Sequence, residues 1–237
     1  ARVAEEIKSW LVAENMTPGD RLPSEPELIE RFGMAKGTIR EAMRILEAQG
    51  LIKTRTGPGG GSFVHEVSEE RARALLGNYF YFRHLTIVDI YQIRRALEPE
   101  LAASLAGKLS DLQLAQLEEI TVVYSEPPET SEQEREQHVA SLRFHETLAT
   151  WAQNPMLSFI IGFMARMLSD LTVYRRLYEP RNFDLWHKGR DYHRSLIAAL
   201  RAGDAHLARE TMAAHMEVAQ RLMERQEAQM ARRFLAP

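Results

Sequence analysis

Apolar residues recur every three or four positions through the first 50 residues, in three separate runs. The first run spans 3–14, the stretch TPGDRLPS interrupts it, and Ser24 then stands where it would cap a second helix. Gly33 ends that short helix, and a longer helical pattern stops at Gly50. The sequence LIKTRTGPGGGSFV predicts two short strands around a glycine-rich tip. The apolar positions of the three helices are Val3, Ile7, Trp10, Leu11, Leu28, Ile29, Phe32, Ile39, Met43 and Leu46.

From Leu75 onward the helical period continues and no strand alternation interrupts it. The polar stretch EVSEERARAL joins the two halves. We expect a mainly α protein with an N-terminal unit at 1–66, a linker at 67–74 and an all-α bundle of six or seven helices at 75–231. The expected helices of the bundle are 86–106, 110–124, 132–152, 155–178, 184–201 and 204–231.

The order helix, short turn, helix and two-stranded hairpin in residues 1–66 is that of a winged helix-turn-helix, whose second helix enters the DNA major groove. Lys36 and Arg40 lie one turn apart on that helix, Thr38 lies beside them, and Gly37 allows close approach of the backbone. Arginine forks onto a guanine edge, whereas lysine and threonine contact phosphates. A solvated helix that binds nothing is the alternative, and the glycine-rich wing argues against it. The expected DNA-contacting residues are Ala35, Lys36, Gly37, Thr38, Arg40, Arg44, Arg55, Thr56 and Gly57.

Charge and composition narrow the class of protein. The net charge is -3, yet residues 31–61 carry six basic side chains against two acidic ones, a local basic patch suited to nucleic acid. No apolar run approaches the roughly 20 residues of a membrane span, and residues 1–7 lack the pattern of a signal peptide. The absence of cysteine excludes disulfides and thiolate chemistry. We therefore expect a cytoplasmic protein with no membrane association.

Two histidines near the C-terminus lie on apolar helical stripes, where an imidazole is costly unless another group satisfies it. The Gly203-Asp204 pair predicts a turn between two antiparallel helices. His193 lies ten residues before Gly203 and His215 twelve after it, about 15 and 18 Å along the helix axes. The two side chains are therefore expected to lie nearly level on facing stripes. His145, with apolar neighbours on its own helix, is a third candidate.

Several segments in order resemble one family. LPSEPELIERFGMAKGTIREAMRILEAQGLI followed by GPGGGSFV resembles the winged helix of GntR-type regulators. IYQIRRALEPELAASLA, FHETLATWAQNPML and HRSLIAALRAGDAHLARETMAAHM resemble the FCD effector-binding domain of the FadR subfamily. The resemblance covers roughly residues 20–225. It implies a bacterial, nucleoid-associated transcription regulator, usually a repressor, that binds a palindromic operator as a homodimer and whose bundle binds a small carboxylic acid.

The resemblance also implies site residues. FCD domains often hold a divalent metal, zinc or nickel, with three histidines, which correspond here to His145, His193 and His215, and with an aspartate one turn before the first of them. Ser141 occupies that aspartate position, and His138 is a possible substitute ligand. Arg94 matches an arginine of the family bundle that could clamp an effector carboxylate, while a structural ion pair is the equal alternative.

Departures from the family pattern leave several questions open. Pro26, Ala35 and Lys36 replace residues that family members use near DNA, so the family operator is not expected to apply, because lysine cannot reproduce a forked guanine contact. The alternatives to a metal-bound effector are a metal-free pocket lined by satisfied histidines, a bundle that only dimerises, and a histidine-metal hydrolase. The hydrolase is disfavoured, because no acidic residue stands out in the sequence as a general base.

Overall fold

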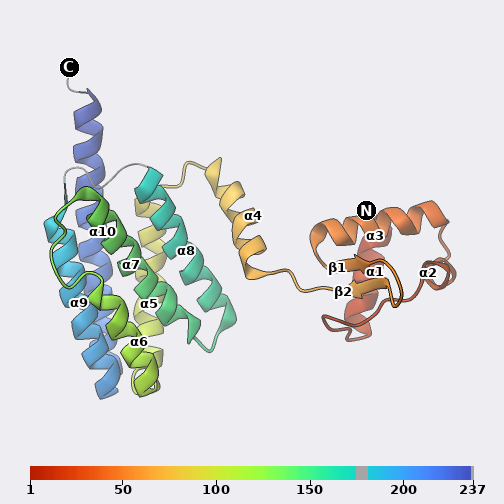
Figure 1. Cartoon of the computed structure of the whole chain (residues 1–237), viewed down its shortest axis with the longest axis horizontal. Coiled ribbons are helices and arrows are strands. Elements are labelled where there is room, and N and C mark those ends of the chain that lie inside the picture. Colours follow the sequence, from red (N-terminus) through yellow and green to blue (C-terminus); the bar gives the residue numbers. More distant parts are fainter. Residues whose placement is uncertain (175–180, 236–237) are drawn as a thin grey trace. The chain divides into compact units, whose positions relative to one another are not determined.

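The computed structural model describes the backbone of residues 1–174 and 181–235, and the chain divides into two compact units, Ala1–Leu76 and Gly77–Pro237. The boundary falls within a helix, α4 (Glu69–Tyr81). Figure 1 shows a small unit with one hairpin and a larger unit made of helices. The expectation of a mainly α fold is confirmed. Among the described residues, no helix combines the length and apolarity needed to cross a bilayer.

The first unit, the head, is built from α1 (Arg2–Ala13), α2 (Glu25–Phe32), α3 (Lys36–Gln49) and the antiparallel strands β1 (Ile52–Arg55) and β2 (Gly61–Val64). The backbone N–H of Ser24 donates to Glu27 at 2.7 Å, which fixes the start of α2. Gly33 and Gly50 end α2 and α3 in the left-handed conformation, as the sequence predicts. Buried residues of all three helices form one core, which includes Ile7, Leu28, Ile39, Leu46 and Ile52.

Residues 67–74 were expected to form a linker, and that expectation missed α4, which begins at Glu69. The Ser68 hydroxyl accepts a hydrogen bond from the Arg71 N–H at 3.2 Å, and two glutamates occupy the first turn, so the local signals favour a helix. No described residue of α4 is fully buried. Apolar residues do recur at helical spacing in its second half, at Leu75, Leu76, Tyr79 and Phe80, but the charged first turns were interpreted as a polar linker.

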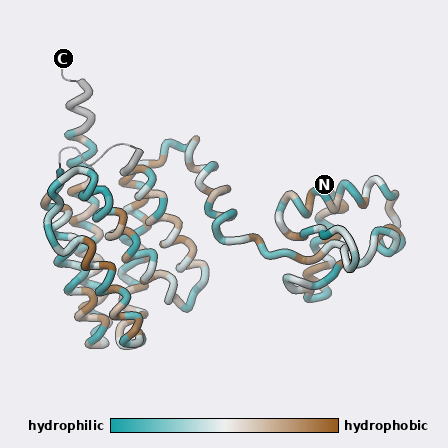
Figure 2. The backbone as a smooth tube through the Cα atoms, viewed as in Figure 1, coloured by the Kyte–Doolittle hydropathy of each residue, from teal (hydrophilic) through white to brown (hydrophobic). Residues whose placement is uncertain are grey.

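In the residues that the structure describes, the second unit, the bundle, contains the end of α4 and six further helices. Their bounds are α5 (Ile87–Leu105), α6 (Asp111–Val122), α7 (Ser131–Thr150), α8 (Pro155–Tyr174), α9 (Phe183–Ala202) and α10 (Ala205–Leu235). The predicted helices match these within a few residues, except that the expected end at 178 lies outside the described residues. Helix α10 packs along α5 and α9, and α7 packs along α8 and α6. Hydrophobic and hydrophilic positions alternate around the helices (Figure 2), so each presents an apolar face to the common core.

Candidate metal centre, effector pocket and DNA-binding face

Three histidines from three helices meet inside the bundle. His145 on α7, His193 on α9 and His215 on α10 are all buried. The Nε2 atom of His145 lies 3.1 Å from that of His193 and 3.2 Å from that of His215. The turn between α9 and α10 runs through Gly203, whose φ is 72°. As predicted for level positions across this turn, the ring centroids of His193 and His215 are 4.8 Å apart.

This histidine cluster fits a divalent metal. Zinc holds nitrogen ligands at about 2.0–2.1 Å, so the nitrogens of one coordination sphere lie roughly 3 Å from one another. Nε2 of His145 lies at that separation from the Nε2 atoms of His193 and His215. Glu98 Oε2 lies 2.6 Å from His145 Nδ1, which favours the tautomer with its proton on Nδ1 and leaves the lone pair on Nε2. That single lone pair can accept one hydrogen bond, yet two other Nε2 atoms approach it. A cation shared by all three lone pairs satisfies the cluster better than hydrogen bonds between the rings.

Arg94 and Glu98 lie one turn apart on α5, beside the histidine cluster, and Glu98 contacts His145. Their side chains are 1% exposed and form an ion pair. The Nη2 atom of Arg94 has no hydrogen-bond partner among the described residues, and Arg94 also lines the neighbouring pocket. The two alternatives that the sequence left open for this arginine are therefore compatible, because Nε is paired with Glu98 while Nη2 is available. Glu98, whose Oε2 lies 2.6 Å from His145 Nδ1, was not among the residues expected at this site.

The protonation states also suit metal binding. Burial lowers the pKa of His193 and His215 well below the ordinary value, and neighbouring imidazoles and Arg94 lower it further. Burial lowers the pKa of His145 as well, although the charge of Glu98 opposes the shift. Burial alone would raise the pKa of Glu98, but Arg94 and His145 outweigh it and hold that pKa at about 2. The site thus offers three neutral imidazoles and one ionised carboxylate that orients them.

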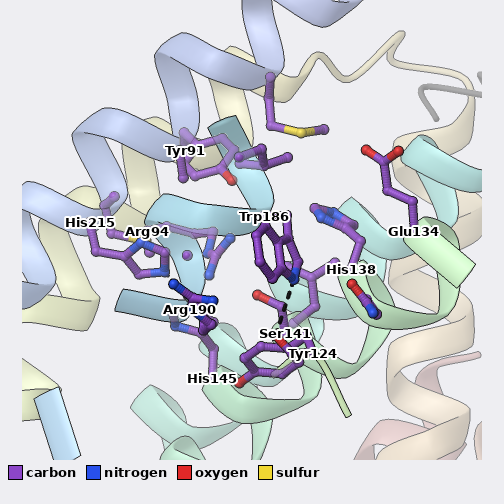
Figure 3. A pocket seen from close by; sticks show the side chains of 17 residues that line it. Tyr91, Arg94, Tyr124, Glu134, His138, Ser141, His145, Trp186, Arg190 and His215 are labelled. Carbon is purple, nitrogen blue, oxygen red and sulfur yellow. Dashed lines mark hydrogen bonds between the residues drawn. The ribbon is translucent and has the colours of Figure 1, made fainter. Parts of the chain in front are cut away.

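A pocket opens beside the cluster and follows one face of α7. Figure 3 shows Arg94, His145 and His215 grouped at one side of this pocket and Glu134 at the other. Helix α9 supplies the facing wall, where the Trp186 indole donates to the Tyr124 carbonyl at 3.1 Å. The Tyr124 hydroxyl lies 2.9 Å from His193 Nδ1 and so orients that ring. The α7 face of the pocket is lined by Glu134, Gln137, His138, Ser141, Leu142 and His145.

Ser141 and His138 occupy the positions where the sequence analysis looked for a fourth ligand. Both line the pocket, but among the described residues the cluster that could hold a metal contains only His145, His193 and His215. Burial lowers the pKa of His138 to about 4, with smaller contributions from Arg94 and His145. His138 is therefore a neutral pocket-lining group, and the described part of the cluster includes no aspartate or glutamate ligand.

The basic residues expected to contact DNA lie on the exposed side of α3 and on the hairpin. Lys36, Arg40 and Arg44 follow one another at four-residue spacing on α3, and all are exposed. A Cβ atom at Gly37 would meet nothing within 4 Å, so the start of α3 is open to a partner. On the hairpin, Arg55 lies over the Phe63 ring at 4.8 Å. Ala35 precedes α3 as its N-cap, Thr38 is exposed on its first turn, and Thr56 and Gly57 lie at the exposed hairpin tip.

One residue that the sequence analysis did not single out joins these cations. Glu25, at the start of α2, accepts a hydrogen bond from Arg40 Nε at 2.6 Å and lies 3.4 Å from Lys36 Nζ. These contacts lower the pKa of Glu25, with the Arg40 hydrogen bond as the largest cause. In the free protein, Glu25 thus contacts both Lys36 and Arg40, the two basic residues expected at the start of the DNA-contacting helix.

Comparisons with known proteins agree with this arrangement. Residues 1–64 match the description "Bacterial regulatory proteins, gntR family", and residues 89–218 match the FCD domain. The "Putative L-lactate dehydrogenase operon regulatory protein" of Escherichia coli K12 is 29% identical over 97% of this chain and 88% of its own length. The "Exu regulon transcriptional regulator" of the same organism is 26% identical over 91% of this chain and 81% of its own length.

A solved structure shows the same fold. The chain described as Streptococcus agalactiae GntR is 20% identical and superimposes with a TM-score of 0.61, covering 93% of this chain and 98% of the other. The matching regions account for both units, and the relatives are transcription regulators rather than enzymes. The chain therefore belongs to the GntR family of bacterial transcription regulators and carries a C-terminal FCD domain.

Proposed function

We propose that this regulator is a cytoplasmic homodimeric repressor of the FadR subfamily that releases a palindromic operator when a small carboxylic acid binds its bundle. In this proposal residues 1–66 bind DNA, 67–74 connect the units and 75–231 bind the effector and dimerise. His145, His193 and His215 hold a zinc or nickel ion, with Arg94 beside it. The convergence of the three Nε2 atoms next to an arginine whose Nη2 has no partner among the described residues carries the proposal.

Each residue at this site has a separate task. A bound zinc or nickel ion supplies positive charge and open coordination positions to an acid. Glu98 keeps the His145 proton on Nδ1, and the Tyr124 hydroxyl fixes the His193 ring. Arg94 Nη2 donates to a carboxylate oxygen, a charge-assisted contact that a neutral ligand cannot make. An acid that binds one arrangement of the bundle better than another shifts the population of that arrangement and thereby changes operator affinity.

The residues of the head support the DNA-binding part of the proposal. Lys36, Arg40 and Arg44 on α3, with Ala35, Gly37 and Thr38 at its start, present donors to a major groove. Arg55, Thr56 and Gly57 of the hairpin lie on the wing that would contact the adjacent phosphates. A homodimer repeats this surface, which is why we expect a palindromic operator.

Elemental analysis of the full chain, purified without a metal-affinity tag, tests the metal part. We expect about one zinc or nickel ion per chain in the wild type, loss of that metal in His193→Ala, and retention in a His206→Ala control at an exposed position. No metal in the wild type, together with an unchanged melting temperature on adding zinc, would leave a metal-free pocket as the correct alternative. Arg94 would then be the main anchor of the effector.

Fluorescence anisotropy tests the regulatory part. An operator is first selected from random DNA with the wild-type chain, and the affinity for it is then measured with and without small carboxylic acids. We expect at least one acid to weaken binding in the wild type and to have no effect in Arg94→Met. Equal responses in the two proteins would contradict the assignment of Arg94.

A further inference from the structure

We propose that Arg21 is a positioning residue for operator binding, whose guanidinium holds the tip of the β1–β2 hairpin in one conformation. The tip comprises residues 56–60, and the proposed DNA contacts of the hairpin, Arg55, Thr56 and Gly57, lie where it begins. This inference rests on the proposed function, because it takes the hairpin as a part of the head that contacts DNA. It adds a residue that acts through the hairpin rather than on the DNA itself.

The backbone of Arg21 is paired with the hairpin, although the residue comes before α2 in the chain. Arg21 forms an antiparallel bridge with Phe63 of β2. The Leu22 N–H donates to the Ser62 carbonyl at 2.8 Å, which extends this pairing by one residue. The segment before α2 therefore lies along the edge of β2 that is not paired with β1. This pairing fixes the position from which the Arg21 side chain extends toward the tip.

The Arg21 guanidinium contacts the hairpin at two adjacent glycines. Its Nη2 donates to the Gly60 carbonyl at 2.7 Å. The guanidinium also lies against Gly61, where an added Cβ atom would be 3.0 Å from Nε and 3.3 Å from Nη2. Both distances are shorter than an ordinary contact of about 3.5–4.0 Å between non-bonded heavy atoms. The absence of a side chain at Gly61 is therefore what allows the guanidinium to lie against the end of the tip.

The tip is a segment whose conformation is costly to fix. Gly57, Gly59 and Gly61 have φ values of 92°, 78° and 144°, which glycine adopts readily and other residues rarely. The Gly60 N–H donates to the Gly57 carbonyl at 2.8 Å and closes a turn. Glycine loses more conformational entropy on ordering than any other residue. A tip that Arg21 has already ordered binds DNA without that cost at the moment of binding.

The position of Arg21 also relates the tip to the DNA-contacting helix. Arg21 borders the groove between the hairpin and α3, together with Arg40 and Arg44. At the base of the hairpin, Glu47 of α3 accepts a hydrogen bond from the Thr54 N–H at 2.9 Å. The base of the hairpin is thus attached to α3 by Glu47, and the tip is held by Arg21. Without Arg21 the tip would move relative to α3, and the two would no longer meet DNA as one preformed surface.

Fluorescence anisotropy of the full chain with the selected operator is the first test. Arg21→Met keeps an unbranched side chain but removes the guanidinium, and we expect it to bind the operator about tenfold more weakly than the wild type. Arg2→Met removes an exposed arginine from α1 of the same unit and is expected to bind like the wild type. Equal affinities of Arg21→Met and the wild type would overturn the inference. If the wild type binds no DNA, the proposed function itself fails.

A double-mutant cycle with Arg55→Met separates positioning from a direct contact with DNA. If Arg21 acts through the hairpin, its substitution matters less once a main hairpin contact has been removed. We therefore expect Arg21→Met to weaken binding about tenfold in the wild type but less than threefold in Arg55→Met. Equal losses in the two backgrounds would mean that Arg21 binds the DNA independently, which would overturn its role as a positioning residue.

Limited trypsin digestion without DNA measures the tip directly, because proteases cleave mobile, exposed loops first. We expect cleavage after Arg55 to be at least fivefold faster in Arg21→Met than in the wild type, and unchanged in Arg2→Met. An unchanged rate after Arg55 in Arg21→Met would overturn the inference. Equally faster cleavage after Arg31 on α2 would mean that Arg21 supports the whole head, which would contradict a role confined to the tip.

Discussion

Two glutamates, one in each unit, make the same kind of contact in opposite surroundings. Glu25 holds Arg40 at 2.6 Å and lies 3.4 Å from Lys36, while Glu98 is paired with Arg94 and lies 2.6 Å from His145. The side chain of Glu25 is 33% exposed and its cations more so, whereas the side chains of Glu98 and Arg94 are 1% exposed. Both glutamates pair with an arginine and contact a second basic residue, but only the pair of Glu25 is accessible to solvent.

The difference in burial separates charges that can change partners from charges that cannot. At the surface, water screens the attraction and replaces a lost partner, so a phosphate or a base edge can compete for Arg40. In the bundle, breaking the pair would leave an unpaired charge in a medium that solvates it poorly. A DNA-binding face needs charges that can exchange one partner for another. A site that must keep imidazoles oriented needs charges that stay paired.

Replacing each glutamate on α5 in turn tests the buried half of the comparison. Glu98→Gln leaves Arg94 buried without its counter-ion, and we expect the free energy of unfolding to fall by about 3–5 kcal/mol. Glu100→Gln, two residues away, removes an exposed pair with Arg209 and is expected to have no measurable effect. Chemical denaturation of the two variants and the wild type measures both. Equal losses would mean that burial does not distinguish these pairs.

The next largest expected effect is the dependence of the free energy of unfolding on pH in the metal-free chain. Burial lowers the pKa of His145, His193 and His215, so below the ordinary value of about 6.5 the unfolded state binds more protons than the folded state. Stability is therefore present above pH 6.5 and is lost as the pH falls, by up to about 1.4 kcal/mol per unit for each histidine. Denaturant unfolding after metal removal, at several values between pH 7 and 5, measures the slope.

Single substitutions show which groups in the pocket cause the change of the free energy of unfolding with pH. His138, whose pKa is lowered to about 4, contributes over the window from 6.5 to 4, so His138→Gln is expected to flatten the loss on acidification. Glu134 acts in the opposite direction, because its raised pKa of about 7 makes stability fall as the pH rises from 4.5 to 7. Glu134→Gln should therefore steepen the loss on acidification. A His206→Gln control at an exposed position is expected to leave the slope unchanged.

In the head, Arg40→Lys separates charge from geometry. The variant keeps the positive charge but loses the fork, so we expect discrimination between the selected operator and random DNA to fall by roughly 1–3 kcal/mol while affinity for random DNA changes little. Arg44→Lys on the same helix is the control, since a phosphate contact does not need the fork. Anisotropy titrations with both DNAs measure the ratio. An unchanged ratio in Arg40→Lys would remove Arg40 from base reading.

The sequence alone predicted most of the fold because its signals are local. Gly33, Gly50 and Gly203 end helices in the left-handed conformation that glycine favours, and apolar periodicity gave the helices of the bundle to within a few residues. The same locality placed His193 level with His215, because one short turn relates their helices. Helix α4 was missed, because its first two turns are dominated by charged residues, which were interpreted as a polar linker.

Contacts between distant segments were harder to predict. Glu98 and His145 come from α5 and α7, and no spacing in the sequence relates them. The available signal for Glu98 was a glutamate one turn after Arg94 in the mostly buried helix α5. Tyr124, which orients His193 across 69 residues of chain, had none. Glu25 resembles an ordinary surface carboxylate, and its contact with Arg40 depends on how α2 crosses α3.

The smallest expected effect on stability, and the one that completes the comparison, belongs to Glu25→Gln. Because Glu25 is partly exposed and water screens its pair, we expect no measurable change in the free energy of unfolding. DNA binding should respond instead. Removing a negative charge beside Lys36 and Arg40 is expected to raise affinity for random DNA several-fold and to steepen its dependence on salt.

The matched control is Glu41→Gln, which also removes an exposed carboxylate beside a cation of α3, with 3.9 Å between Glu41 and Arg44. Both variants should raise affinity for random DNA through charge. Only Glu25→Gln is expected also to change discrimination for the selected operator, because Glu25 accepts a hydrogen bond from Nε of Arg40, the residue predicted to contact a base edge. If the two variants behave alike, Glu25 acts through charge alone. The exposed pair would then position nothing, whereas Glu98 would still position His145.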